Sequence, residues 1–125
     1  MYAKTYDDGF TWTDPEILNP QIKRPTKETA LLVSPGQGLL TSDGTIVIPF
    51  YDHGDGEENA SIIWSDDNGK TWERSNDVPG AAAGGYWSSE SEVVELSDGT
   101  LRMFFRSGQG VVCYSDAVRN TSGRS

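Results

Sequence analysis

Glu90 and Arg106 are the two residues of this sequence whose types and spacing could support chemistry. They lie near the two ends of SESEVVELSDGTLRMFFRS, residues 89–107, which reads as two strands joined by a tight turn. A three-residue loop at 97–99, with its glycine in the left-handed conformation, would place Glu90 opposite Arg106. A two-residue loop would place Arg106 opposite Ser91 and separate the pair onto two faces. Spacing alone favours a cross-strand ion pair of little energetic value.

An eight-residue pattern that occurs twice indicates how the strands are connected. It reads TYDDGFTW at 5–12 and SDDNGKTW at 65–72. In each copy the aspartate can accept hydrogen bonds from its own turn, and the glycine can adopt positive φ. The threonine begins the next strand, and the tryptophan anchors it. The residues with this expected structural role are Thr5, Asp7, Gly9, Thr11 and Trp12, and Ser65, Asp67, Gly69, Thr71 and Trp72.

A longer repeat surrounds these turns. SDGTIVIPF at 42–50 aligns with SDGTLRMFF at 97–105, and IIWSD at 62–66 aligns with VCYSD at 112–116. Each unit reads as strand, tight turn, strand, loop, strand, eight-residue turn, strand. The sequence therefore predicts an all-β fold made of four-stranded antiparallel blades, that is, a partial β-propeller of about two and a half blades.

The repeat divides the chain into successive parts. We expect the end of one blade at 1–14, a connection at 15–34, a full blade at 35–78, an incomplete blade at 86–116 and a polar tail at 117–125. Strands of the full blade are predicted near 36–41, 45–52, 60–65 and 71–75. The third turn fails because Ala117 and Arg119 stand where aspartate and glycine are required, so we interpret the chain as ending, or departing from the pattern, inside that blade. Its open edges are expected to permit self-association.

Composition excludes several classes of function. The net charge is −9 and the pI about 4.4, which argues against binding to nucleic acid and to anionic membranes. We expect no signal peptide and no membrane-spanning segment, and the compartment stays open. The single cysteine allows no internal disulfide. The acidic run DGEEN at 55–59 lacks EF-hand spacing, so no metal and no cofactor are expected.

Two motifs carry a resemblance to a known family, which covers about residues 1–116. The eight-residue pattern resembles the Asp-box of sialidases and related β-propellers. The run ESEVVELSDGT, followed by FFRS, resembles the sialidase segment E-x-Q-V-V-E-L-x-D-G that ends in M-R. PGQGLLTSDGTIVIPFY at 35–51 is similar to the sialidase run PGxGI…LVIPxY. Glu92 departs from the family, which often has glutamine there. The resemblance implies the six-bladed sialidase propeller.

The resemblance also implies roles for the pair. By position, Glu90 corresponds to the glutamate that activates the nucleophilic tyrosine of sialidases, and Arg106 to the second arginine of the triad that binds the sialic acid carboxylate. An arginine fork suits a carboxylate. A charged nucleophile would be repelled by that substrate, which agrees with the use of tyrosine in sialidases, and a neutral tyrosine needs a base.

The implied function is that of a sialidase-like glycoside hydrolase fragment. Its parent would be an exo-α-sialidase that releases terminal sialic acids, with a sialylated glycan as substrate. The family's first arginine, acid/base aspartate, third arginine and nucleophilic tyrosine have no counterpart in these residues. We therefore expect the chain alone to be inactive. The alternative is a non-catalytic Asp-box propeller segment that serves as a binding or interaction module.

Overall fold

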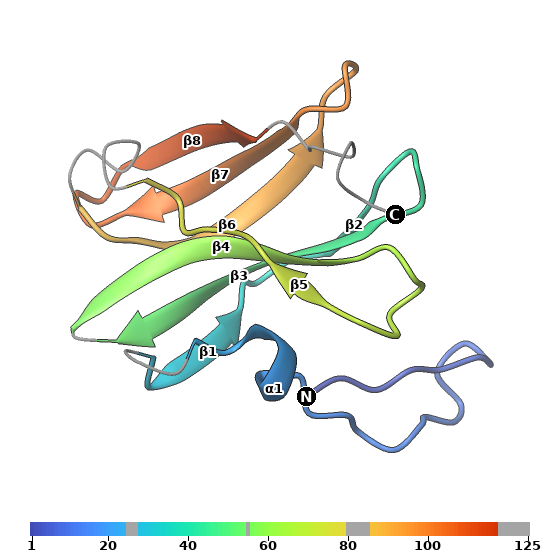
Figure 1. The fold of residues 1–125 in the computed structure, drawn as a ribbon. Helices are drawn as coiled ribbons and strands as arrows, with labels where there is room; N and C mark the ends of the chain where they lie inside the picture. Colours follow the sequence, from blue (N-terminus) through green and yellow to red (C-terminus); the bar gives the residue numbers. More distant parts are fainter. Residues whose placement is uncertain (25–27, 55, 80–85, 118–125) are drawn as a thin grey trace.

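Antiparallel strands make up nearly all the regular structure of this protein, seen in a computed structural model that describes residues 1–24, 28–54, 56–79 and 86–117. The strands form two sheets that lie against each other, and the N-terminal segment runs beside the first of them (Figure 1). As the sequence predicts, the fold is a partial β-propeller of antiparallel strands; within the described residues, one sheet has five strands and the other three.

The first sheet is built around two long strands, β3 (Ile46–Gly54) and β4 (Glu57–Ser65), which pair along their whole length. The short strand β2 (Leu39–Leu40) pairs with the start of β3, and β5 (Glu73–Arg74) pairs with β4 on the far side. These four antiparallel strands lie close to their predicted positions. The run IVIPFY forms β3 because its β-branched and aromatic residues suit a half-buried sheet.

The segment at 15–34 differs from the expected plain connection. It holds a four-residue helix, α1 (Asn19–Ile22), and a further strand, β1 (Ala30–Val33), which pairs with the second half of β3. The helix carries proline in its first turn, where the missing N–H costs nothing. Leu18 and Ile22 are buried against Phe50, Ile63 and Trp72. Burial of these apolar residues explains why the segment is ordered despite its prolines.

The second sheet has the order β6 (Ser88–Glu95), β7 (Leu101–Ser107) and β8 (Val112–Ala117). The β6–β7 turn is the three-residue loop: Leu96 N–H donates to Thr100 at 2.8 Å, and Gly99 has a φ of +85°. The strand β8 includes Ala117, the first residue of the expected tail. The rest of that tail, with Arg119, lies outside the described residues.

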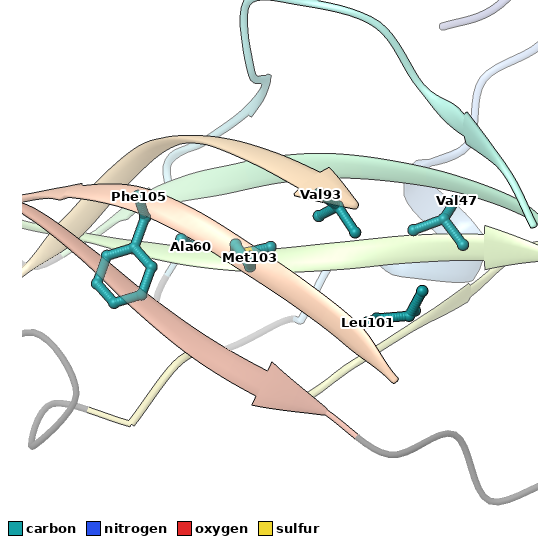
Figure 2. Close-up of a cluster of buried hydrophobic side chains, with 6 residues drawn as sticks. All are labelled: Val47, Ala60, Val93, Leu101, Met103 and Phe105. Carbon is teal, nitrogen blue, oxygen red and sulfur yellow. The ribbon is translucent and has the colours of Figure 1, made fainter. Parts of the chain in front are cut away.

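The main hydrophobic core lies between the two sheets, and Figure 2 shows its six buried side chains. The first sheet contributes Val47 and Ala60, and the second contributes Val93, Leu101, Met103 and Phe105. Alternate residues of β7 are buried, which matches the two-residue period of a strand with one covered face. This shared core fixes β6 against the first sheet and thereby sets the position of Glu90 at its start.

The second eight-residue turn has the predicted hydrogen bonds. The carboxylate of Asp67 accepts from the backbone N–H groups of Lys70 at 3.0 Å and Thr71 at 2.9 Å. Hydrogen bonds, above all from Thr71, hold the pKa of Asp67 well below its usual value. Trp72 is only 6% exposed, and the ring of Tyr2 packs edge-on against it. The turn thus joins two strands without facing the Glu90 region.

The first eight-residue turn has the same internal bonds. Asp7 accepts from the backbone and the hydroxyl of Thr11 at 2.9 and 2.6 Å, and these bonds lower its pKa. Trp12, however, is 63% exposed. We expected Trp12 to be covered like Trp72 unless its blade was too incomplete to cover it. Among the described residues, no further strand lies over Trp12.

Candidate functional site

Glu90 and Arg106 are in contact at the end of the β6–β7 hairpin that lies away from its turn. Nη1 of Arg106 donates to Oε2 of Glu90 at 3.2 Å. The pairing is regular from Glu95–Leu101 to Ser91–Phe105, as the three-residue loop predicts. Beyond that point the register shifts, and the next pair is Ser88–Ser107. Counting on from Ser91–Phe105 places Glu90 opposite Arg106, as the sequence predicts, and the β-bulge between Ser88 and Ser91 begins at this pair.

The carboxylate of Glu90 is ionised and accessible. The Ser89 hydroxyl donates to it at 2.9 Å, and this bond, followed by that from Arg106, lowers the pKa of Glu90. The Glu90 side chain is 41% exposed and that of Arg106 is 55% exposed. From the alternation of β6 we expect Glu90 to be the most covered of its three glutamates. Glu92 is indeed exposed, but Glu95 is in the same half-buried range as Glu90. An accessible anionic carboxylate can accept a proton from a substrate or from a neighbouring side chain.

Arg106 lies between two hollows on the surface. One, of about 230 Å³, is lined by His53, Gly56, Glu58, Trp87 and Arg106. The other, of about 260 Å³, includes Glu90, Phe104 and Arg106 in its lining. The guanidinium carbon of Arg106 lies 5.2 Å from the centre of the Trp87 ring. A cation that is stacked on one aromatic face and open to two hollows can bind an anion from solvent.

Tyr51 is a further neighbour that sequence reasoning did not assign to the site. Burial raises its pKa, and the negative charges of Glu90 and Glu58 raise it further, against the opposing charge of Arg106. A raised pKa keeps the phenol protonated, so Tyr51 does not have the character of an activated nucleophile. In the sequence, the only indication that Tyr51 lies near the site is its position at the end of the apolar run TIVIPFY.

Trp87 was also missed by sequence reasoning. It precedes β6 directly, and its carbonyl accepts from the N–H of Gly108 at 2.9 Å. Regular counting from the three-residue loop would pair Gly108 with Ser88. The bulge shifts this pairing by one residue, so that Trp87 lies opposite Gly108, next to Arg106. The repeat alignment did not reveal it, because the aligned segments of this unit begin at residue 97, after Trp87.

A buried charge cluster, made of Arg74, Glu28 and Asp52, lies on the other side of the first sheet. The guanidinium of Arg74 donates to Glu28, and to Asp52 at 2.6 Å, and it stacks 4.7 Å from the ring centre of Phe50. The three charged side chains are only 4–5% exposed. Burial raises the pKa of Asp52 despite these bonds. The cluster ties β3 and β5 to the segment after α1, and its burial indicates a structural role.

The described part of the chain was also searched for metal sites and for membrane-spanning helices. There, no group of three or more histidine, cysteine, aspartate or glutamate side chains is arranged to hold a metal ion. None of the helices described is long and apolar enough to cross a membrane.

Comparisons with known proteins place the chain in a family. Residues 1–123 match the BNR repeat-like domain. A sialidase of Bacteroides fragilis is 36% identical over 112 residues, which are 88% of this chain and 19% of that protein. The structure of Hadza microbial sialidase Hz136 is similar, with a TM-score of 0.81 and 28% identity over 98% of this chain. An intramolecular trans-sialidase from Ruminococcus gnavus, solved with oseltamivir carboxylate, has a TM-score of 0.73 and 26% identity over 97% of this chain.

These matches cover nearly all of this chain but only a small part of each relative. The chain spans about a fifth of the Bacteroides fragilis protein and 24% of each of the two solved chains. The likeness nevertheless covers both sheets and the hairpin that carries Glu90 and Arg106. The chain therefore belongs to the BNR repeat-like domain family and is a sialidase-like segment of a β-propeller.

Proposed function

We propose that this chain forms the part of an exo-α-sialidase that carries the tyrosine-activating base, Glu90, and one carboxylate-binding arginine, Arg106. The contact between Glu90 and Arg106, with both side chains accessible, is the observation that carries the proposal. Similarity to proteins named sialidases supports it. The substrate would be a terminal sialic acid of a glycoconjugate. The interaction-module alternative draws no support from these relatives.

The two side chains would act in sequence on such a substrate. The carboxylate of sialic acid would bind the guanidinium of Arg106 through charge-assisted hydrogen bonds. It would thereby compete with Glu90 for that guanidinium, and its own negative charge would raise the pKa of Glu90. Substrate binding would thus make Glu90 a stronger base at the moment when a tyrosine from another blade needs to lose its proton to it.

Replacement of Arg106 by lysine tests the carboxylate-binding role. The test uses a chain that carries residues 1–125 together with the remaining blades, called here the complete propeller. We expect Arg106→Lys to raise the KM for a fluorogenic sialoside by about 10- to 100-fold with a smaller change in kcat, because a point charge replaces a bidentate fork.

The matched control is Arg102→Lys on the same strand. Arg102 forms a bidentate pair with Asp116 at 2.7 and 2.8 Å, away from Glu90. We expect its KM to stay at the wild-type value. An unchanged KM in Arg106→Lys would contradict the proposed role of this arginine.

The 125-residue chain by itself is expected to show no turnover of the same sialoside. It spans about a quarter of the solved relatives, and the nucleophile and acid that the resemblance requires are not among its residues. Loss of one member of such a site removes orders of magnitude in rate. The measurement is fluorescence release by the purified chain over hours. Activity that elutes with a monomer of this chain on size exclusion would overturn the expectation.

A further inference from the structure

The ion pair with Glu90 is not sufficient to fix the orientation of the Arg106 guanidinium. Its contact with Glu90 is a single hydrogen bond of 3.2 Å between two accessible side chains. Such exposed pairs contribute little, and an arginine side chain has much rotamer freedom to lose. An arginine that must receive a carboxylate in one orientation needs a further constraint, because ordering it during binding would weaken affinity.

Trp87 supplies that constraint. Its indole ring lies under the guanidinium carbon of Arg106 at 5.2 Å, within the range of a cation–π contact. Both side chains line the hollow of about 230 Å³, so the ring also shapes the space beside the cation. A ring contact of this kind uses none of the N–H donors with which a guanidinium binds a carboxylate.

Gly108 holds the ring in place. Its N–H donates to the carbonyl of Trp87 at 2.9 Å, which extends the β6–β7 pairing by one step. A Cβ atom at this position would lie 2.8 Å from Cε2 and from Nε1 of the indole, closer than atoms can approach. The ring therefore lies directly on the backbone at Gly108, two residues beyond Arg106. The indole of Trp87 is thus in contact with both Arg106 and the backbone of Gly108 at the end of the hairpin.

We propose that Trp87, seated on Gly108, is a positioning residue that pre-orients Arg106 for a carboxylate ligand. This inference rests on the proposed function of Arg106. Trp87 acts through Arg106, and it needs no contact with the reacting atoms. The expected consequence is an effect on substrate affinity that depends on the presence of the arginine.

The test compares variants of the complete propeller by KM and kcat for a fluorogenic sialoside. Trp87→Leu keeps apolar bulk but removes the aromatic face, and we expect KM to rise by about 2- to 30-fold with a smaller change in kcat. Trp87→Phe should restore most of the affinity. Gly108→Ala should reproduce the Trp87→Leu phenotype, because its Cβ displaces the ring. Introduced into Arg106→Met, Trp87→Leu should have no further effect on KM.

The chain offers a matched control. Arg102 stacks on Tyr114 at 4.5 Å, an arginine–aromatic contact between β7 and β8. Tyr114→Leu removes the same kind of contact and should leave KM unchanged. If Trp87→Leu has the wild-type KM, the proposal is wrong. If Trp87→Leu lowers the melting temperature and Trp87→Phe fails to restore affinity, Trp87 only supports the fold, and the proposal is equally wrong.

The carboxylate-binding role of Arg106 and the positioning role of Trp87 can be refuted independently. Wild-type KM in Arg106→Lys refutes the proposed function of the arginine itself. A raised KM in Arg106→Lys together with a wild-type KM in Trp87→Leu refutes only the positioning role.

Discussion

Replacement of Arg74 by methionine is expected to lower the free energy of unfolding by about 3–5 kcal/mol. The side chain of Arg74 is 4% exposed and bonds to two buried carboxylates, Glu28 and Asp52. Methionine fills similar space but leaves both carboxylates without their cation, and an uncompensated buried charge is costly. The measurement is urea-induced unfolding followed by tryptophan fluorescence.

The same chain provides a control of the same chemical change. Arg102→Met removes an arginine from the half-exposed pair with Asp116, and we expect a loss of at most about 1 kcal/mol. Equal losses for Arg74→Met and Arg102→Met would show that burial does not increase the contribution of the Arg74 cluster to the free energy of unfolding.

The pH dependence of the Arg74→Met effect follows from Asp52. Burial already raises the pKa of Asp52 in the folded protein, and loss of Arg74 removes a group that opposes this shift. A group whose pKa is raised on folding favours the folded state below its unfolded pKa and loses that contribution as pH rises through the folded value. The destabilisation by Arg74→Met should therefore be larger at pH 7 than at pH 4.

Glu90→Gln in the complete propeller is expected to lower kcat by about 10²- to 10⁴-fold, with little change in KM. The substitution keeps the shape of the side chain and removes its ability to accept a proton. Steady-state kinetics with a fluorogenic sialoside measure both constants. Glu92→Gln is the matched control, because Glu92 is an exposed residue of the same strand that makes no described hydrogen bond to Arg106.

The pH profile adds a second readout for Glu90. A base acts when ionised, so kcat/KM should fall as pH drops through the pKa of Glu90 in the free enzyme. Bonds from Ser89 and Arg106 lower that pKa, so the acidic limb should lie below the ordinary carboxyl value of 4.5. Ser89→Ala should move the limb upward. An acidic limb that stays in place in Ser89→Ala would argue that another group titrates there.

Much of the fold was predictable because its signals are local. Turn residues at 97–99 fix the hairpin register, and alternation along β7 identifies the buried face. The eight-residue turns were predictable for the same reason, since each aspartate bonds within its own turn. The segment at 15–34 was less readable, because its order comes from contacts of Leu18 and Ile22 with strands far along the chain.

The candidate site was predictable in its residues but less so in its geometry. Register counting predicted that Glu90 and Arg106 would meet, and they do. It did not predict the β-bulge beyond this pair, which places Ser88 opposite Ser107. Tyr51 and Trp87 were missed because they reach Arg106 from another sheet and from outside a strand. The Arg74 cluster was missed because Glu28, Asp52 and Arg74 are distant in sequence.

One edge of the first sheet is formed by two separate strands, β1 and β2, and this affects how blades could be exchanged between related proteins. Between β1 and β2 the chain leaves its own sheet, and Ser34 bonds to the hydroxyl and the backbone N–H of Ser91 in β6 at 3.1 and 3.2 Å. Ser42, in the turn that follows β2, bonds to Glu95 at the C-terminal end of β6. A graft cut between the sheets would remove the hydrogen-bond partners of Ser91 and Glu95. A graft that keeps these bonds must therefore carry residues 30–45, the strand β3 with which they pair, and the β6–β7 hairpin.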